Sequence, residues 1–213
     1  MWNWIKSLFK KNNTTSVKKT EPEKNPIDEA IKAPKPSDPI GSGKIAILVG
    51  HGAGDPGATC WNGMAEHEYN KKVAAIIESR LPNVTLYFKS NIGGWSPTYA
   101  KLALSRPDLS IELHLNAYNG SAKGCEVLIT GESSRSIGEM FAAEFCMKYQ
   151  RVMRGAKGIK KLGDGDRGFG NVYSANKSAK KSILVEPFFC DNKSEWIEPS
   201  DYAEFLISFL KKV

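Results

Sequence analysis

Strand-like and helix-like patterns alternate from residue 44 to residue 212, and this alternation constrains the fold more than any other feature of the chain. Short apolar, β-branched runs predict strands, and longer stretches with apolar residues three and four apart predict helices. The alternation favours a single α/β domain with a mixed, mostly parallel sheet and helices on both faces. We predict strands at 44–49, 84–88, 109–115, 126–130 and 182–188, and helices at 66–81, 97–105, 134–150 and 200–212.

Two stretches of different composition precede the predicted domain, which we place at residues 41–213. Residues 1–11 read MWNWIKSLFKK, with tryptophans and aliphatic residues on one side of a helical wheel and lysines on the other. This pattern predicts a short basic amphipathic helix that could bind an anionic membrane. Residues 12–40 are rich in Lys, Glu, Pro, Asn and Ser, and we expect a flexible linker there.

The formal net charge of +7 indicates an anionic partner such as nucleic acid, anionic lipid or bacterial cell wall. The chain has no helix-turn-helix, zinc-knuckle or aromatic RNA-binding signature, so we expect no nucleic-acid partner. We find no apolar stretch long enough to span a membrane and no secretory signal peptide. We therefore expect the protein to accumulate in the cytoplasm in which it is made.

The four cysteines lie far apart and form no C-x-x-C pair. This spacing argues against a zinc ribbon, a thioredoxin-like site and a disulfide framework. Cys125 and Cys190 lie in apolar runs, so we expect both to be small buried residues.

Polar residues follow three of the predicted strands at their carboxyl ends. His51 follows Gly50 at the end of the first strand, His114 ends the strand LSIELHL, and Glu186 follows an apolar run. In open α/β sheets, sites form outside these strand ends. Glu66 heads the inward stripe of the helix 66–81, because Asn70, Val73 and Ile77 share its face, whereas His67 and Glu68 lie off that stripe.

Two histidines and an inward glutamate with an open position form a recognised catalytic zinc shell. Zinc lowers the pKa of its bound water to about 7, and a nearby carboxylate can pass the water proton to a leaving amine. Each residue also has an ordinary structural interpretation. A strand-end histidine is usually structural, Glu66 could be a favourable charge in a first helical turn, and Glu186 could pair with a basic residue. Their joint placement favours a site for amide hydrolysis.

Residues 151–181 are glycine-rich and basic, and we predict a long loop that could contact a substrate. A disordered insertion is the alternative. The run GDGDRG from Gly163 matches G-x-G-x-x-G, but we predict neither a strand before it nor a helix after it, which argues against a dinucleotide site. Trp61 and Trp95 could line a substrate groove or pack in the core or a loop.

Four motifs occur in order within residues 44–212 and together resemble the zinc-dependent N-acetylmuramoyl-L-alanine amidases of bacterial cell-wall hydrolases and phage endolysins. GHGAGDPGA resembles the family's G-H-G motif, GMAEHEYN its G-x-x-E-x-x-x-N segment, IELHLNA its H-x-N-A motif and VEPFFCDN its E-x-x-F-x-x-N motif. RGAK, from Arg154, is similar to the R-G-V-K that often precedes the family's last strand.

The resemblance implies that His51, Glu66 and His114 bind one Zn²⁺ and that Glu186 is the catalytic carboxylate. Asn116 and Arg154 become candidate substrate-binding residues. The bond cleaved in the family joins the lactyl group of N-acetylmuramic acid to L-alanine of the stem peptide of peptidoglycan.

The chain departs from the family pattern at two positions near the implied site. Glu112 stands where the family usually has Ser, and Phe188 replaces a common Gly. Both could alter groove shape and substrate preference. Glu126 is an alternative site acid, although a strand position near a surface loop is the simpler interpretation.

We expect a phage endolysin that is held in the host cytoplasm before lysis and then reaches the periplasm or cell wall. The alternatives are a host amidase for wall remodelling, a zinc peptidase that cuts the stem peptide, and a non-enzymatic protein that binds cell wall or membrane. The sequence predicts no oligomeric state.

Overall fold

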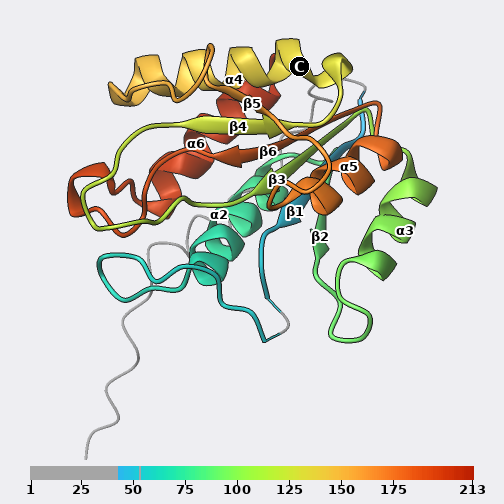
Figure 1. The fold of residues 1–213 in the computed structure, drawn as a ribbon. Coiled ribbons are helices and arrows are strands. Elements are labelled where there is room, and N and C mark those ends of the chain that lie inside the picture. The colour runs from blue at the N-terminus through green and yellow to red at the C-terminus, as the bar shows by residue number, and fades with distance from the viewer. Residues whose placement is uncertain (1–42, 53) are drawn as a thin grey trace, which may run out of the picture.

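The computed structural model describes residues 43–52 and 54–213, so the predicted helix at 1–11 and linker at 12–40 lie outside the described residues. The predicted α/β alternation is confirmed (Figure 1). The strands are β1 (Ile45–Val49), β2 (Val84–Phe88), β3 (Leu109–Leu113), β4 (Glu126–Ile129), β5 (Ile159–Lys161) and β6 (Lys181–Glu186). The helices are α2 (Glu66–Arg80), α3 (Ser96–Ser105), α4 (Arg135–Tyr149), α5 (Phe169–Ser178) and α6 (Pro199–Leu210), with short 3-10 turns η1 (Glu132–Ser134) and η2 (Lys193–Glu195).

The strands form one mixed sheet in the order β2-β1-β3-β6-β4-β5. Strands β2, β1, β3 and β6 are parallel neighbours, so their carboxyl ends lie at one edge of the sheet. Strand β4 runs antiparallel to β6 and pairs Glu126 with Glu186. The start of β4 therefore lies at the same edge as the end of β6, and we call this edge the carboxyl edge.

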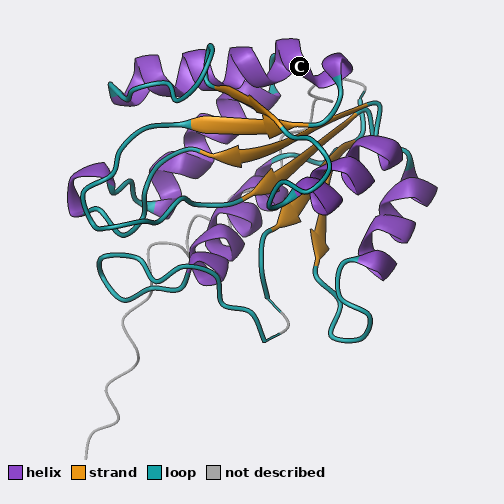
Figure 2. Ribbon diagram, in the orientation of Figure 1, coloured by secondary structure: helices purple, strands orange, loops and turns teal. Residues whose placement is uncertain are grey.

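Helices cover both faces of the sheet, as Figure 2 shows. One face carries the larger core, in which β1 residues such as Ile47 pack with side chains of α2, α4 and α6. On the other face, Leu48 packs with Leu102 of α3 and Ala175 of α5. Alternate β1 side chains are buried on opposite faces, which explains why this strand is an uninterrupted apolar run.

The prediction of a long loop over residues 151–181 is wrong, because this segment contains β5 and α5. The prediction of no strand before Gly163 and no helix after it is also wrong, since β5 precedes that glycine and α5 begins at Phe169. Helix α5 has a weak helical sequence, FGNVYSANKS, but buries Val172 and Ala175. Packing against the sheet stabilises it more than intrinsic propensity does.

The four cysteines are buried and free, which confirms the expectation for Cys125 and Cys190. Among the helices that the structure describes, none has the length and apolar character required to cross a membrane.

Candidate active site

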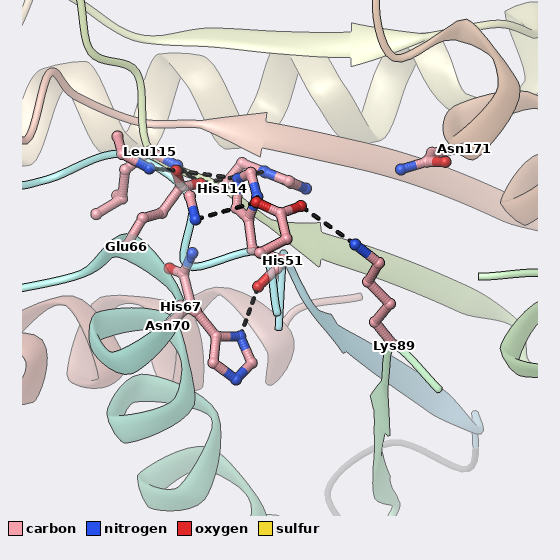
Figure 3. A network of polar contacts seen from close by, with 12 residues as sticks. His51, Glu66, His67, Asn70, Lys89, His114, Leu115 and Asn171 are labelled. Carbon is pink, nitrogen blue, oxygen red and sulfur yellow. Dashed lines mark hydrogen bonds and ion pairs between the residues drawn. The ribbon is translucent and has the colours of Figure 1, made fainter. Parts of the chain in front are cut away.

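Three chain segments and one helix bring the predicted site residues together at the carboxyl edge of the sheet. His51 follows β1, His114 follows β3, and Glu186 ends β6. Glu66 enters from the first turn of α2, whose inward stripe of Asn70, Val73 and Ile77 is buried as predicted. Figure 3 shows His51, Glu66 and His114 converging between the strand ends and the helix.

The imidazole and carboxylate groups of these three residues lie in direct contact. His51 Nε2 lies 3.0 Å from Glu66 Oε2, and His114 Nδ1 lies 3.1 Å from Glu66 Oε1. His114 Nδ1 also lies 3.1 Å from His51 Nε2. The three residues form a group of potential metal ligands whose donor atoms all lie within 4.8 Å of one another.

The backbone at Gly50 and His51 explains why a histidine follows a glycine at the mouth of a buried strand. A Cβ atom at Gly50 would lie 2.3 Å from the Leu113 carbonyl oxygen and 2.8 Å from the His114 ring. His51 itself has φ of +62°, in the left-handed region that non-glycine residues rarely occupy. The close approach and the turn together aim the His51 ring at Glu66 and His114.

Glu66 is a buried carboxylate that the surrounding backbone holds in place. The amide N–H groups of Ala58 and Leu115 donate to its two oxygens at 3.0 and 2.9 Å. Burial opposes its ionisation, but hydrogen bonds from His114 and His51 outweigh burial and lower the pKa of Glu66 to about 2. Glu66 is therefore a carboxylate at neutral pH.

Each histidine also has a carboxylate on the ring nitrogen that faces away from the cluster. His51 Nδ1 lies 3.1 Å from Asp55, which also accepts a hydrogen bond from Lys89 at 3.2 Å. His114 Nε2 lies 3.1 Å from Glu112. Burial lowers the pKa of both imidazoles, but their carboxylate neighbours outweigh it and hold the pKa of His51 above, and that of His114 well above, the usual range. The pocket therefore stabilises positive charge between these groups.

The contributions of Asp55 and Glu112 were not predicted from the sequence. Asp55 lies in the first motif, four residues after His51, and Glu112 lies two residues before His114 on the same strand. These spacings are the only sequence signals for either contact.

Glu186 shares a cavity of about 790 Å³ with His51, Glu66 and His114. Its Oε2 atom is shielded from solvent and has no hydrogen-bond partner among the described residues. Burial, with a smaller contribution from the negative charges of Glu66 and Glu126, raises the pKa of Glu186 to about 8. This carboxyl group can hold or release a proton near neutral pH.

The two candidate substrate-binding residues meet at Glu126. Asn116 lines the cavity and donates to Glu126 Oε1 at 3.3 Å. Arg154 lies outside the cavity lining, donates to Glu126 Oε2 at 3.0 Å, and places its guanidinium 4.9 Å from the centre of the Phe189 ring. Glu126 thus lies beside the site, opposite Glu186, and links these two residues.

Four further predicted positions lie apart from the cluster. His67 Nδ1 donates to the Gly50 carbonyl at 2.8 Å and so supports the turn before His51. Glu68 is exposed, as predicted. Trp61 packs edge-on against Trp196, and Trp95 stacks on Tyr99, and neither tryptophan lines the cavity.

The donor set fits a zinc ion. Ligand bonds of about 2.0–2.1 Å at tetrahedral angles place neighbouring donor atoms about 3.3 Å apart. His51 Nε2 and His114 Nδ1 lie 3.1 Å apart, close to that separation, and each nitrogen contacts one of the two oxygens of Glu66. His₂Glu is also a donor set that catalytic zinc sites use.

Comparisons with known proteins agree with this geometry. The family model described as N-acetylmuramoyl-L-alanine amidase matches residues 45–204. The catalytic domain of the CD27L endolysin, which targets Clostridia difficile, is 26% identical, with a TM-score of 0.59 over 80% of this chain and 97% of that chain.

The amidase AmiC2 of Nostoc punctiforme has a TM-score of 0.60 over 81% of this chain and 97% of that chain. At 20% identity this second likeness shows the fold alone. No curated protein matches the chain. Because the family model covers most of the chain, including all four motif residues of the site, the protein belongs to the N-acetylmuramoyl-L-alanine amidase family.

Proposed function

We propose that the protein is a zinc-dependent amidase that hydrolyses the bond between the lactyl group of N-acetylmuramic acid and L-alanine in peptidoglycan. The observation that carries the proposal is the mutual contact of His51, Glu66 and His114 in one cavity with Glu186. One Zn²⁺ held by the first three residues would supply Lewis-acid activation of water and of the scissile carbonyl. The fit of the donor set supports this metal.

Glu186 is the proposed general base and acid. Its carboxylate accepts a proton from the attacking water and then delivers that proton to the nitrogen of L-alanine as the C–N bond breaks. The products are a free lactyl carboxylate and a free α-amino group. Burial raises the pKa of Glu186 to about 8 in the metal-free protein, and a catalytic group is most effective when its pKa lies near the working pH.

Alongside its carboxylates, the lining of the cavity has two basic side chains that can attract an anionic group of a substrate. Lys160 and Arg167 lie on its exposed side, and Asn116 lies deeper beside Glu126. The stem peptide of peptidoglycan carries carboxylates, which these basic groups would attract. We propose that Asn116 contacts the substrate directly and that Arg154 acts by holding Glu126 in place.

Product analysis tests the proposal directly. Purified peptidoglycan incubated with the zinc-loaded protein should release peptides whose new amino-terminal residue is L-alanine. A zinc peptidase would expose a different amino-terminal residue, and a non-enzymatic wall-binding protein would release no new amines. Metal analysis of the same sample should find one zinc ion per chain.

We further propose a phage endolysin that is held in the host cytoplasm and reaches the wall through a membrane lesion. Support comes from the likeness to the CD27L endolysin domain and from a basic charge that fits an anionic wall. Expression inside a host should cause rapid lysis only when the inner membrane is permeabilised. Growth-linked wall remodelling without lysis would favour the alternative of a host amidase.

A further inference from the structure

A buried carboxylate outside the four motif residues of the site contacts His114. Glu112 lies on β3, two residues before His114, and its side chain points to the sheet face that α3 and α5 cover. Glu112 Oε1 accepts from His114 Nε2 at 3.1 Å, and the Glu112 side chain is only 2% exposed. Glu112 is not one of the residues that could jointly hold the metal, because it touches the ring nitrogen on the far side.

Neutral groups complete the surroundings of this carboxylate. The Tyr99 hydroxyl donates to Glu112 Oε2 at 3.0 Å, and Asn171 Nδ2 lies 3.5 Å from Oε1. Within the described part of the chain, His114 is the one ion-pair partner of Glu112. Burying a carboxylate costs free energy unless it is paired, so the contact with the His114 imidazole is what stabilises the Glu112 carboxylate.

Each ring nitrogen of His114 lies 3.1 Å from a carboxylate, Nδ1 from Glu66 and Nε2 from Glu112. A carboxylate can only accept a hydrogen bond, so Nε2 must be the N–H that donates to Glu112. In the Nε2–H tautomer, Nδ1, which faces Glu66 and His51, carries no proton and offers its lone pair. This is the tautomer in which His114 can bind a metal through Nδ1.

We propose that Glu112 is a positioning residue that fixes His114 in its Nε2–H tautomer and strengthens the binding of a divalent cation through Nδ1. This inference rests on the proposed zinc site and assigns part of its affinity to a carboxylate two residues from a ligand. Tyr99 supports the arrangement by holding the second oxygen of Glu112 in place.

The test is the zinc affinity of the full-length chain, measured by competition with a chelator of known affinity. Removing a carboxylate partner of a metal-binding histidine typically weakens metal affinity by about 10–100-fold. We expect that loss for Glu112→Gln, which keeps the shape but removes the charge, and for Glu112→Ser, which removes the contact. Tyr99→Phe should cause a smaller loss in the same direction.

Glu195→Gln is the matched control, because Glu195 is also 2% exposed and makes its contacts with residues outside the site. It accepts from the Gly124 amide at 3.0 Å and pairs with Arg151. We expect Glu195→Gln to lower the thermal stability of the metal-free protein while zinc affinity stays at the wild-type value. If Glu112→Gln behaves in the same way, Glu112 is merely structural and the inference is overturned.

A measurement on the wild type keeps the inference testable if the Glu112 variants do not fold. Nitrogen-15 spectra of the zinc-loaded protein should show His114 protonated at Nε2 and coordinated at Nδ1. The opposite assignment would overturn the inference even if zinc binds normally. A wild-type chain that binds no zinc would overturn the proposed function as well, so the two failures can be told apart.

Discussion

Two cavities of similar volume lie at opposite edges of the same sheet, and their linings differ in kind. The one at the carboxyl edge, of about 790 Å³, contains His51, Glu66, His114 and Glu186. The other, of about 650 Å³, lies at the amino edge, where Ile45, Leu109 and Met140 form apolar walls and Lys181 and Lys212 are among the polar residues. In the carboxyl-edge cavity, buried Glu66 contacts two partly buried imidazoles, whereas the ion pair of Asp108 and Lys180 in the amino-edge cavity is exposed. Convergence of shielded titratable groups therefore identifies the site better than cavity size does.

The difference follows from the direction of the parallel strands. At the amino edge, Ile45, Leu109 and Lys181 are in register as the first residues of β1, β3 and β6. At the other edge, the chain leaves the same strands into turns that carry His51 and His114. The same strand pairing thus leaves an apolar-walled cavity at the amino edge and brings the histidines and carboxylates of the site together at the carboxyl edge.

The largest expected effect is the loss of metal from a ligand variant at the carboxyl edge. His51→Ala should lose bound zinc and the thermal stabilisation that zinc gives, because metal binding adds to the free energy of folding. Metal analysis and thermal unfolding with and without zinc measure both. Lys181→Ala, at the amino-edge cavity, is the control and should keep its zinc. Full zinc occupancy in His51→Ala would remove His51 from the ligand set.

His114→Ala should lose zinc too, with an added cost that His51→Ala lacks. It leaves Glu112 buried without its ion-pair partner, and breaking a buried pair typically costs about 3–5 kcal/mol. The metal-free His114→Ala protein should therefore unfold at a lower denaturant concentration than metal-free His51→Ala. Equal midpoints would show that the Glu112 contact contributes little to stability.

The next largest effect is on the turnover rate and leaves the zinc content unchanged. Glu186→Gln keeps the shape of the side chain but cannot accept a proton, and general acid–base groups typically contribute about 10²–10⁴-fold. We expect a folded, zinc-loaded protein whose turnover on peptidoglycan falls by about that factor. Turnover close to wild type would reject Glu186 as the base and direct attention to Glu126, its antiparallel partner.

The sequence predicted the strand-end residues because they depend on a general property of parallel sheets. Once 44–49, 109–115 and 182–188 are parallel strands, His51, His114 and Glu186 must lie at one edge. The missed elements β5 and α5 lack such a signal. Strand β5 has three residues, and α5 contains Gly170 and Asn171, so tertiary packing decides their structure. The contacts of Glu112 with Tyr99 and Asn171 depend on that packing, and strand periodicity alone could not reveal them.

A smaller effect concerns the pH dependence of stability in the metal-free protein. The pKa of Glu186 is about 8 in the folded protein, against an ordinary value of 4.5. The folded state therefore binds a proton that the unfolded state has released, and this contribution to stability is full below pH 4.5 and is lost as the pH rises through 8. Glu66, with a pKa of about 2, stays ionised over the same range.

Glu186→Gln should accordingly match the wild type near pH 5 and exceed its thermal stability near pH 9. The variant avoids the buried charge, and each kcal/mol shifts the midpoint by about 2–4 °C at this chain length. Thermal unfolding of both chelator-treated proteins at the two pH values measures the difference. If the difference in unfolding midpoint between the two proteins is the same at both pH values, the pKa of Glu186 is not raised in the folded state.

The smallest expected effect on catalysis comes from removing the first 39 residues of the sequence. The described chain begins at Gly43, which lines the amino-edge cavity, at the edge of the sheet opposite the site. A chain that starts at Ile40 should therefore cleave exposed peptidoglycan at the wild-type rate.

We propose that residues 1–11 instead bind anionic membrane, with lysines contributing about 1 kcal/mol each near the headgroups. The full chain should co-sediment with anionic vesicles and dissociate as salt increases, whereas the shortened chain should stay in the supernatant. Equal partitioning of the two chains would remove the membrane role, and loss of cleavage by the shortened chain would show that the segment contributes to the catalytic domain.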